Sequence, residues 1–431
     1  MHCLLVLSAV VFVAGISSNA HAQDLRTDEA PEQDPPPVAS SGTVPVNRGL
    51  FDEPRLLQDA IKRGFDRFGD SGMPGNGFYL ELSNMITGSG WLAIGPGFRR
   101  SIAGGAGFVD TSAAISWHAY TMLQGRIEFP DLANKHLALG SQVMWQDQTQ
   151  INYFGVGSAS LQSDQSQYRM QSVDSVVYTG IKPVRSLTFG GEYGFLRRPQ
   201  ILSPGGTFKP PVPTTAEQFP ADPGVTDSFQ PNYLHGEASV TSDTRNHRSR
   251  PTRGGVYRVA WTDFVDQSTS TGAFSFRQYE AEAAQFIPMM DDKWVFALHG
   301  WVVASDVPNG HDVPFYMLPT LGGSNTLRSY EDYRFHDRNL ALVSAESRWT
   351  IFEHVDAAAF VDAGNVAPVF NELNLGKTSW GGGLRFHTEK ATFARVDAAY
   401  GAEGWRLVFR TSDPFRLSRL TRRVAAVPFV P

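Results

Sequence analysis

The chain has 431 residues, of which 42% are hydrophobic and 19% are charged, and its formal net charge is -6. This composition excludes a disordered polyelectrolyte, and the scattered Lys and Arg residues do not indicate a nucleic-acid partner. The only cysteine is Cys3, which excludes a disulfide framework and thiol chemistry from the rest of the chain. Beyond residue 22 there is no run of ~18 apolar residues, the length that a membrane-spanning helix needs.

The first segment, residues 1–22, has the pattern of a secretory signal peptide. Its apolar stretch, LLVLSAVVFVAGI, is followed by Ala20 and Ala22, which fit the small-residue rule for cleavage before Gln23, although no Lys or Arg precedes the stretch. The pattern predicts export through the inner membrane.

Two short segments follow the predicted signal peptide. Residues 23–50 are acidic and rich in proline, which is typical of a linker that cannot bury a core. In residues 51–75 the apolar side chains recur with the helical period between Pro54 and Gly69, which predicts one short amphipathic helix.

From about residue 76 to residue 415 the apolar residues alternate with polar ones, as they do in β-strands. The last such segment places Trp405, Leu407 and Phe409 on one face and Arg406 and Arg410 on the other. The alternation predicts strands at 77–87, 91–100, 112–130, 136–147, 166–182, 185–197, 233–242, 255–265, 275–286, 293–303, 340–351, 355–363, 378–388, 391–400 and 404–412.

A soluble sandwich would alternate in the same way, so the connections decide the fold class. Many predicted strands reach about ten residues, the span of a tilted membrane strand, and long connections alternate with short ones along the chain. The count is fifteen, or up to seventeen if the long segments 112–130 and 166–182 are each two strands, and bacterial barrels have an even strand number, so sixteen is the expected value. The sequence therefore predicts an all-β, 16-stranded antiparallel transmembrane barrel over residues 76–415.

Several motifs resemble the bacterial surface antigen family, the BamA/TamA-type outer-membrane assembly and translocation barrels. They are LPTLGGSNTLRSYEDYRFHDRN at 318–339, SAESRW at 344–349, FVDAGNV at 360–366, WGGGLRF at 380–386 and SDTRNHRSRPTRGG at 242–255. The resemblance is strong over 230–415 and rests on pattern alone over 76–230.

The resemblance implies that the long connection 304–338 folds back into the barrel lumen and that Arg328 pairs there with Asp362. We call this pairing the loop latch. The strand period independently places Asp362 on the inward face. Readings without a latch stay open: Arg328 as a solvated loop cation, and Asp362 as a lumen carboxylate paired with another arginine. The implied loop motif consists of Gly322, Gly323, Leu327, Ser329 and Tyr330, with Ser329 where the family has glycine. The expected supporting lumen charges are Glu346, Arg348, Asp356, Arg385, Arg395 and Asp397.

The two ends of the expected barrel differ from the family pattern. The segment between residues 23 and 75 is too short for the family's periplasmic POTRA domains, so a barrel lacking them is expected. Trp405, Leu407, Phe409 and Phe415 resemble an outer-membrane β-signal, but a tail of residues 416–431 continues beyond it, either in the periplasm or in the lumen. Gly401 and Gly404 are compatible with a seam that opens beside the last strand.

No HExxH, GxSxG or phosphate-loop motif occurs, so we expect no catalytic residue, metal or cofactor. The leading hypothesis is a barrel of the outer membrane, in contact with its lipids, that helps to insert or translocate client proteins or lipids. A separate periplasmic partner is a further expectation. The alternatives are a passive pore or structural barrel and, less favoured, a barrel enzyme that acts on lipid or peptide.

Overall fold

The computed structural model describes residues 49–51, 53–54, 76–83, 93–206, 211–225, 230–267, 273–290, 292–388, 392–410 and 413–415. The predicted signal peptide, almost all of the linker, most of the predicted helix and the tail 416–431 lie outside these residues. Within them, no helix has the length and apolar character needed to cross a membrane.

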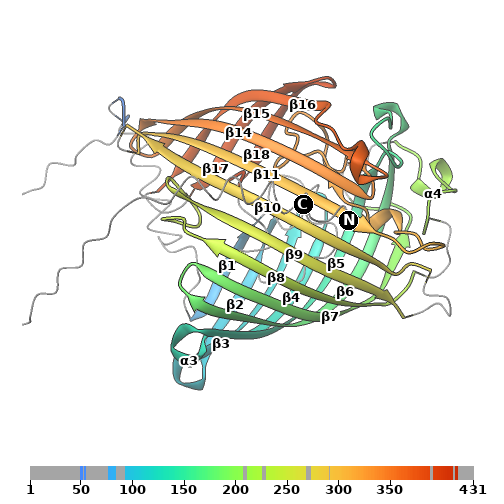
Figure 1. The fold of residues 1–431 in the computed structure, drawn as a ribbon, viewed down its shortest axis with the longest axis horizontal. Helices are drawn as coiled ribbons and strands as arrows, with labels where there is room; N and C mark the ends of the chain where they lie inside the picture. The colour runs from blue at the N-terminus through green and yellow to red at the C-terminus, as the bar shows by residue number, and fades with distance from the viewer. Residues whose placement is uncertain are drawn as a thin grey trace, which may run out of the picture. The chain divides into compact units, whose positions relative to one another are not determined.

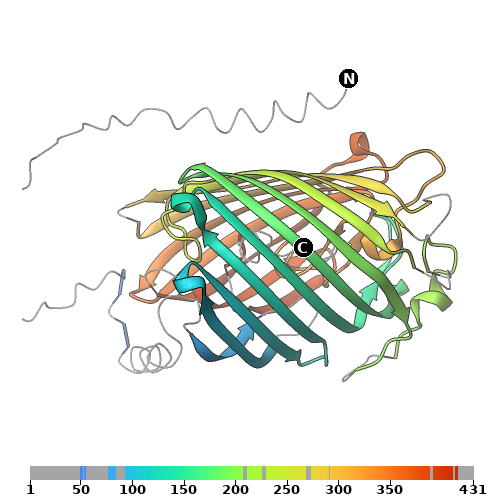
Figure 2. The same ribbon diagram turned by 90° about the horizontal axis from the view of Figure 1, so that it is seen from below.

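Sixteen strands form one antiparallel sheet in which each strand pairs with its neighbours in chain order (Figure 1). They are β1 Gly77–Ser83, β2 Ala93–Ile102, β3 Gly107–Ser116, β4 Thr121–Asp131, β5 Leu137–Tyr153, β6 Ser166–Val184, β7 Leu187–Leu202, β8 Tyr233–Asp243, β9 Gly254–Asp266, β10 Phe276–Met289, β11 Trp294–Asp306, β14 Asn339–Phe352, β15 Val355–Ala367, β16 Lys377–His387, β17 Thr392–Gly401 and β18 Gly404–Arg410. The tilted strands curl around a common axis (Figure 2). The predicted 16-stranded antiparallel barrel fold is confirmed.

Short elements occupy the connections. The two-stranded ladder of β12 Thr320–Leu321 and β13 Phe335–His336 lies in the connection between β11 and β14. The helical turns are α3 Leu132–Lys135, α4 Thr215–Gln218, η1 Ala103–Gly105, η2 Gln162–Asp164, η3 Phe315–Met317 and η4 Phe370–Glu372. In α4, a capping box between Thr214 and Glu217 satisfies the first backbone N–H groups of the turn.

The expected strand at 112–130 is wrong as a single element, because the chain turns between β3 and β4. The turn includes Ala119 with a φ of 61°, a conformation that a glycine or asparagine usually marks in a sequence. The other long candidate, 166–182, is one strand, and it extends to 19 residues in β6. The split of 112–130 brings the fifteen predicted segments to the sixteen that form the sheet.

The burial of the side chains is inverted relative to a soluble protein. On β9, Arg258 and Thr262 are buried, whereas Val259 and Trp261 are 48% and 44% exposed. Large apolar side chains point outward on nearly every strand, while charged and amide side chains fill the inside. This arrangement fits a lipid-facing outer surface and a polar lumen.

The β1 and β18 strands are the two edges of the sheet. No hydrogen-bonded register joins them in the described part of the chain, in contrast to the fifteen registers that join all other neighbours. The barrel therefore has a seam between its first and last strands.

The first described residues contact the short turn between β14 and β15. The backbone N–H groups of Leu50 and Phe51 donate to the carbonyl oxygens of Thr350 and Ile351, at 3.1 and 2.9 Å. The Glu53 carboxylate accepts from the backbone N–H of His354 at 3.1 Å and contacts its Nδ1 at 2.9 Å. The chain thus reaches the barrel at the end where the connections between strands are short.

Candidate functional site: a loop folded into the lumen

The connection between β11 and β14, residues 307–338, folds into the lumen and carries Arg328 and all of the loop-motif residues that the sequence singled out. Its two glycines make the fold-back possible. Gly322 and Gly323 have φ angles of 111° and 106°, and a Cβ atom would lie 2.3 Å from the carbonyl oxygen of Glu331 and 2.2 Å from Asp332 Oδ1, respectively. Only glycine fits both positions without displacing the returning half of the loop.

Arg328 lies at the tip of this loop and is 1% exposed. Its Nη2 donates to Asp362 Oδ1 at 3.1 Å and its Nη1 to Glu346 Oε2 at 2.7 Å. The backbone N–H of Arg328 also points to Asp362, at 3.4 Å, and the guanidinium lies 3.7 Å from the centroid of the Phe360 ring. The structure thus brings Arg328 and Asp362 together and adds Glu346 as the second carboxylate.

A network of charges on the inner wall surrounds this contact. Glu346 accepts from Arg348 at 2.8 Å and from Arg385 at 2.9 Å, while Asp397 accepts from Arg395 at 2.8 Å and also pairs with Arg385. We call the following residues the lumen charge network: Arg328, Arg348, Arg385, Arg395, Glu346, Asp362, Asp397 and Asp413. Its four cations and four anions balance, so removing one member leaves an unpaired buried charge.

Asp356, which was also expected among the lumen charges, belongs to a separate cluster. It contacts His387 Nε2 at 2.9 Å, Thr350 Oγ1 at 2.7 Å and Arg250 Nη2 at 3.3 Å. Arg250 comes from the connection between β8 and β9, so this cluster ties that connection to the wall of β15 and β16.

The other loop-motif residues pack around the tip. Leu327 and Tyr330 are buried in an apolar cluster with Phe335 and Leu340. Ser329, at the position where the resemblance implies a glycine, has no positive φ, and its backbone N–H donates to Ser379 Oγ at 2.9 Å. The serine is therefore accommodated without backbone strain at this position.

The loop also contacts the last strand, through residues that sequence reasoning missed. Asp332 lies 3.3 Å from Arg406 and 3.6 Å from Arg410, and Arg334 pairs with Glu403 at 2.7 Å. On the last strand, the alternation of the sequence placed Arg406 and Arg410 on the face opposite the apolar residues, which indicated that they point into the lumen. Nothing in the loop sequence distinguished Asp332 and Arg334 from solvated charges.

The outermost part of the lumen is filled by aromatic side chains. Phe315 of the loop packs against Tyr153, Tyr168 and Tyr316, with ring centroids 4.8 to 5.5 Å apart. All four are buried in one cluster that joins strands from opposite parts of the sheet. The loop thus adds a packed aromatic cluster to this end of the lumen.

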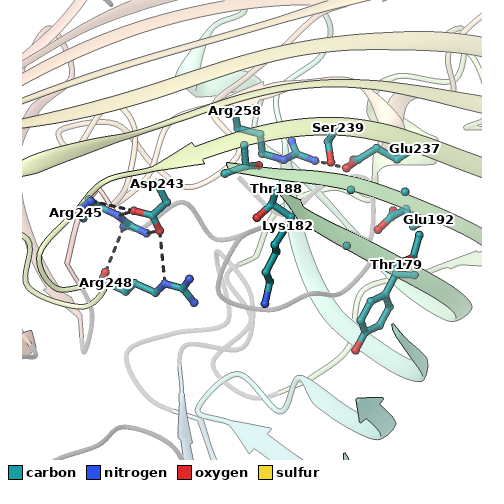
Figure 3. Close-up of a pocket in the computed structure, with 15 residues that line it drawn as sticks. Thr179, Lys182, Thr188, Glu192, Glu237, Ser239, Asp243, Arg245, Arg248 and Arg258 are labelled. Atoms are coloured by element: carbon teal, nitrogen blue, oxygen red, sulfur yellow. Dashed lines mark hydrogen bonds and ion pairs between the residues drawn. The ribbon is translucent and has the colours of Figure 1, made fainter. Parts of the chain in front are cut away.

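A polar cavity of about 150 Å³ lies along β6 to β9 (Figure 3). Asp243 holds Arg245 through two hydrogen bonds of 2.9 Å, which accounts for the Asp-Arg part of the SDTRNHRSRPTRGG motif. Lys182 and Arg248 also line the cavity, which therefore carries charges of both signs (Figure 3).

The expected β-signal divides into two parts. Trp405 and Leu407 are 69% and 64% exposed on the outer face, and Phe409 follows them at the same period. Phe415 does not continue this face: it is 2% exposed and packs inside the lumen against Phe286. Phe415, expected as the last residue of the signal, therefore lies inside the lumen and not on the outer face of Trp405 and Leu407.

Comparisons with known proteins agree with this geometry. Residues 101–403 match the Omp85 superfamily domain. The crystal structure of BamA from Haemophilus ducreyi lacking POTRA domains 1-3 is similar, with 15% identity and a TM-score of 0.57 over 78% of this chain and 69% of that one. CdiB from Escherichia coli has 11% identity and a TM-score of 0.50 over 82% and 69% of the two chains. At these identities the likeness shows the fold alone. No curated protein matches the sequence significantly.

Proposed function

Because this chain belongs to the Omp85 superfamily, we propose that it is an outer-membrane barrel that inserts client proteins into the membrane or translocates them across it. The observation that carries the proposal is the position of Arg328, which the carboxylates of Glu346 and Asp362 hold inside the lumen. The same loop contacts β18 at the seam through Asp332 and Arg334. A loop bound both to the wall and to the seam can control whether the last strand separates from the first.

Export by residues 1–22 and delivery of clients by a separate periplasmic protein are parts of this proposal. The lumen charge network has a structural role in it, because each of its carboxylates is paired with an arginine. The proposed activity is therefore assembly without bond-forming chemistry.

The test is the quantitative outer-membrane proteome of a strain that lacks the chain, compared with strains that carry Arg328→Ala or Arg277→Ala. Arg277 is a matched control, since it pairs with Asp263 on the exposed surface and its side chain is 56% exposed. We expect selective loss of one or several outer-membrane or surface proteins in the deletion and Arg328→Ala strains, and a normal proteome with Arg277→Ala. An unchanged proteome in the deletion strain contradicts the proposal for every client expressed under the conditions used.

A further inference from the structure

The chain does not end its path at the seam after β18. Asp413, a member of the lumen charge network, and Phe415 are 3% and 2% exposed inside the lumen. We call residues 413–415 the C-terminal hook.

The acidic residue of the hook, Asp413, binds Arg348, and Arg348 also contacts the carboxylate that holds Arg328. Asp413 accepts from Arg348 through both oxygens, at 2.8 and 3.2 Å. The Nε of Arg348 donates to Glu346, and Glu346 in turn accepts from Arg328. Such two-pronged contacts between arginine and carboxylate fix both position and orientation.

The aromatic part of the hook fills an apolar pocket on another part of the wall. Phe415 belongs to a buried cluster formed by side chains of β9, β10 and β11. Its ring stacks on the imidazole of His299 with centroids 5.3 Å apart. The guanidinium carbons of Arg328 and Arg348 lie 5.9 and 5.6 Å from the ring centroid, so the ring also contacts the cations of the latch.

We propose that the C-terminal hook is an internal ligand of the loop latch, and that binding of the hook and binding of the loop stabilise each other. Only two residues separate the hook from the end of β18, so the hook holds the end of the seam strand at the lumen for as long as the latch is formed. Arg328 and Phe415 share a contact, and Arg348 joins Asp413 to Glu346. The biological meaning of this coupling rests on the function proposed above, but the coupling itself does not require a client.

The experiment measures amide hydrogen exchange by mass spectrometry on the purified full chain in lipid bilayers, without clients. Coupling between two sites is reciprocal. We therefore expect Phe415→Ala and Asp413→Asn to accelerate exchange in the loop 320–336 by about fivefold or more, and Arg328→Gln to accelerate exchange in residues 413–415 to a similar degree.

Two controls match the chemistry of these changes. Asp110→Asn removes another buried lumen carboxylate, which pairs with Arg99 at 2.8 Å on β2 and β3. Phe189→Ala removes a ring from the outer face, where Phe189 is 45% exposed. Both are expected to leave exchange in the loop and in the hook unchanged.

Acceleration confined to the mutated segment, with the other segment unaffected, overturns the proposal and makes the hook a static chain end. If Arg328→Gln does not fold, Arg328→Lys and the milder Phe415→Leu are measured in the same way and judged by the same criterion. Because no client is present, a failure of the coupling is distinct from an unchanged proteome, which is the failure of the proposed function.

Discussion

Gly401 of β17 faces Ser329 of the lumen loop so closely that a Cβ atom on Gly401 would lie 2.2 Å from Ser329 Oγ. The serine that replaces the family glycine thus fits because the opposite strand has no side chain at this point. The sequence suggested a different role for Gly401, in an opening seam. The contact adds a packing role, and the role in the seam stays a prediction.

This contact predicts that Gly401→Ala destabilises the barrel by about 1 to 3 kcal/mol, the usual cost of overpacking. Adding Ser329→Gly should recover part of the loss, but not all of it, because the new Cβ would still lie 2.8 Å from the carbonyl oxygen of Thr378. Denaturant titration of the free energy of unfolding in lipid measures both effects. Gly125→Ala is the control, since a Cβ there meets nothing within 4 Å; equal destabilisation with and without Ser329→Gly would contradict the steric explanation.

Arg328→Ala should reduce the free energy of unfolding by about 3 to 5 kcal/mol, because Glu346 and Asp362 would lose a buried partner. The exposed pair of Arg277 and Asp263 sets the scale for comparison, and Arg277→Ala should cost less than about 1 kcal/mol. The same titration measures both variants. Similar losses in the two would show that the buried position of Arg328 adds nothing to stability.

The loop should loosen in acid because of His336. Burial, together with the positive charge of Arg334, lowers the pKa of His336 to about 3, whereas an unfolded histidine has a pKa of about 6.5. Between these values the opened loop binds more protons than the docked loop, so docking weakens as the pH falls from 6.5 towards 3. The rings of Tyr153 and Tyr333 that pack against His336 remain neutral over this range.

At pH 5 the shift corresponds to about 2 kcal/mol, or a roughly 30-fold larger equilibrium constant for opening of the loop. Hydrogen exchange of residues 320–336 at pH 7 and pH 5, corrected for the intrinsic rates, measures this change. His336→Gln carries no proton in this range and should reduce the difference between the two pH values. An equal pH dependence in both proteins would assign the effect to other groups.

The aromatic cluster at the outer end of the lumen predicts a low conductance at rest. Phe315→Ala should raise the single-channel conductance in planar bilayers, because it removes the ring on which Tyr153, Tyr168 and Tyr316 converge. Phe189→Ala on the lipid-facing surface is the control and should not change conductance. A wide, steady conductance in the unmodified protein would favour the passive-pore hypothesis instead.

The period of two predicted nearly all of the strands, because lipid on one side and a wet lumen on the other impose strict alternation, and the succession of long and short connections predicted the barrel. It failed at 112–130, where the turn around Ala119 has none of the glycines or prolines that normally mark a break. Alternation also assigned a face to each charge. It did not assign partners, since Asp356 turned out to bind Arg250 and His387 and not the latch.

Long-range contacts are the part of the site that local patterns could not supply. Arg328 and Asp362 came from a family resemblance, but Arg348 binds Asp413, 65 residues further along the chain. The local sequence around Phe415 does not distinguish it from a terminal aromatic residue that faces lipid. Only the inward turn of the chain after β18 distinguishes it.

Three attachments follow one another along β14. Glu346 holds the lumen loop through Arg328, Arg348 holds the C-terminal hook, and the carbonyl oxygen of Thr350 accepts from the backbone N–H of Leu50. At ~3.4 Å per residue these points lie within ~14 Å of one another. A mechanical pull on residues 49–51 is therefore transmitted along a single strand to both the loop and the C-terminal hook.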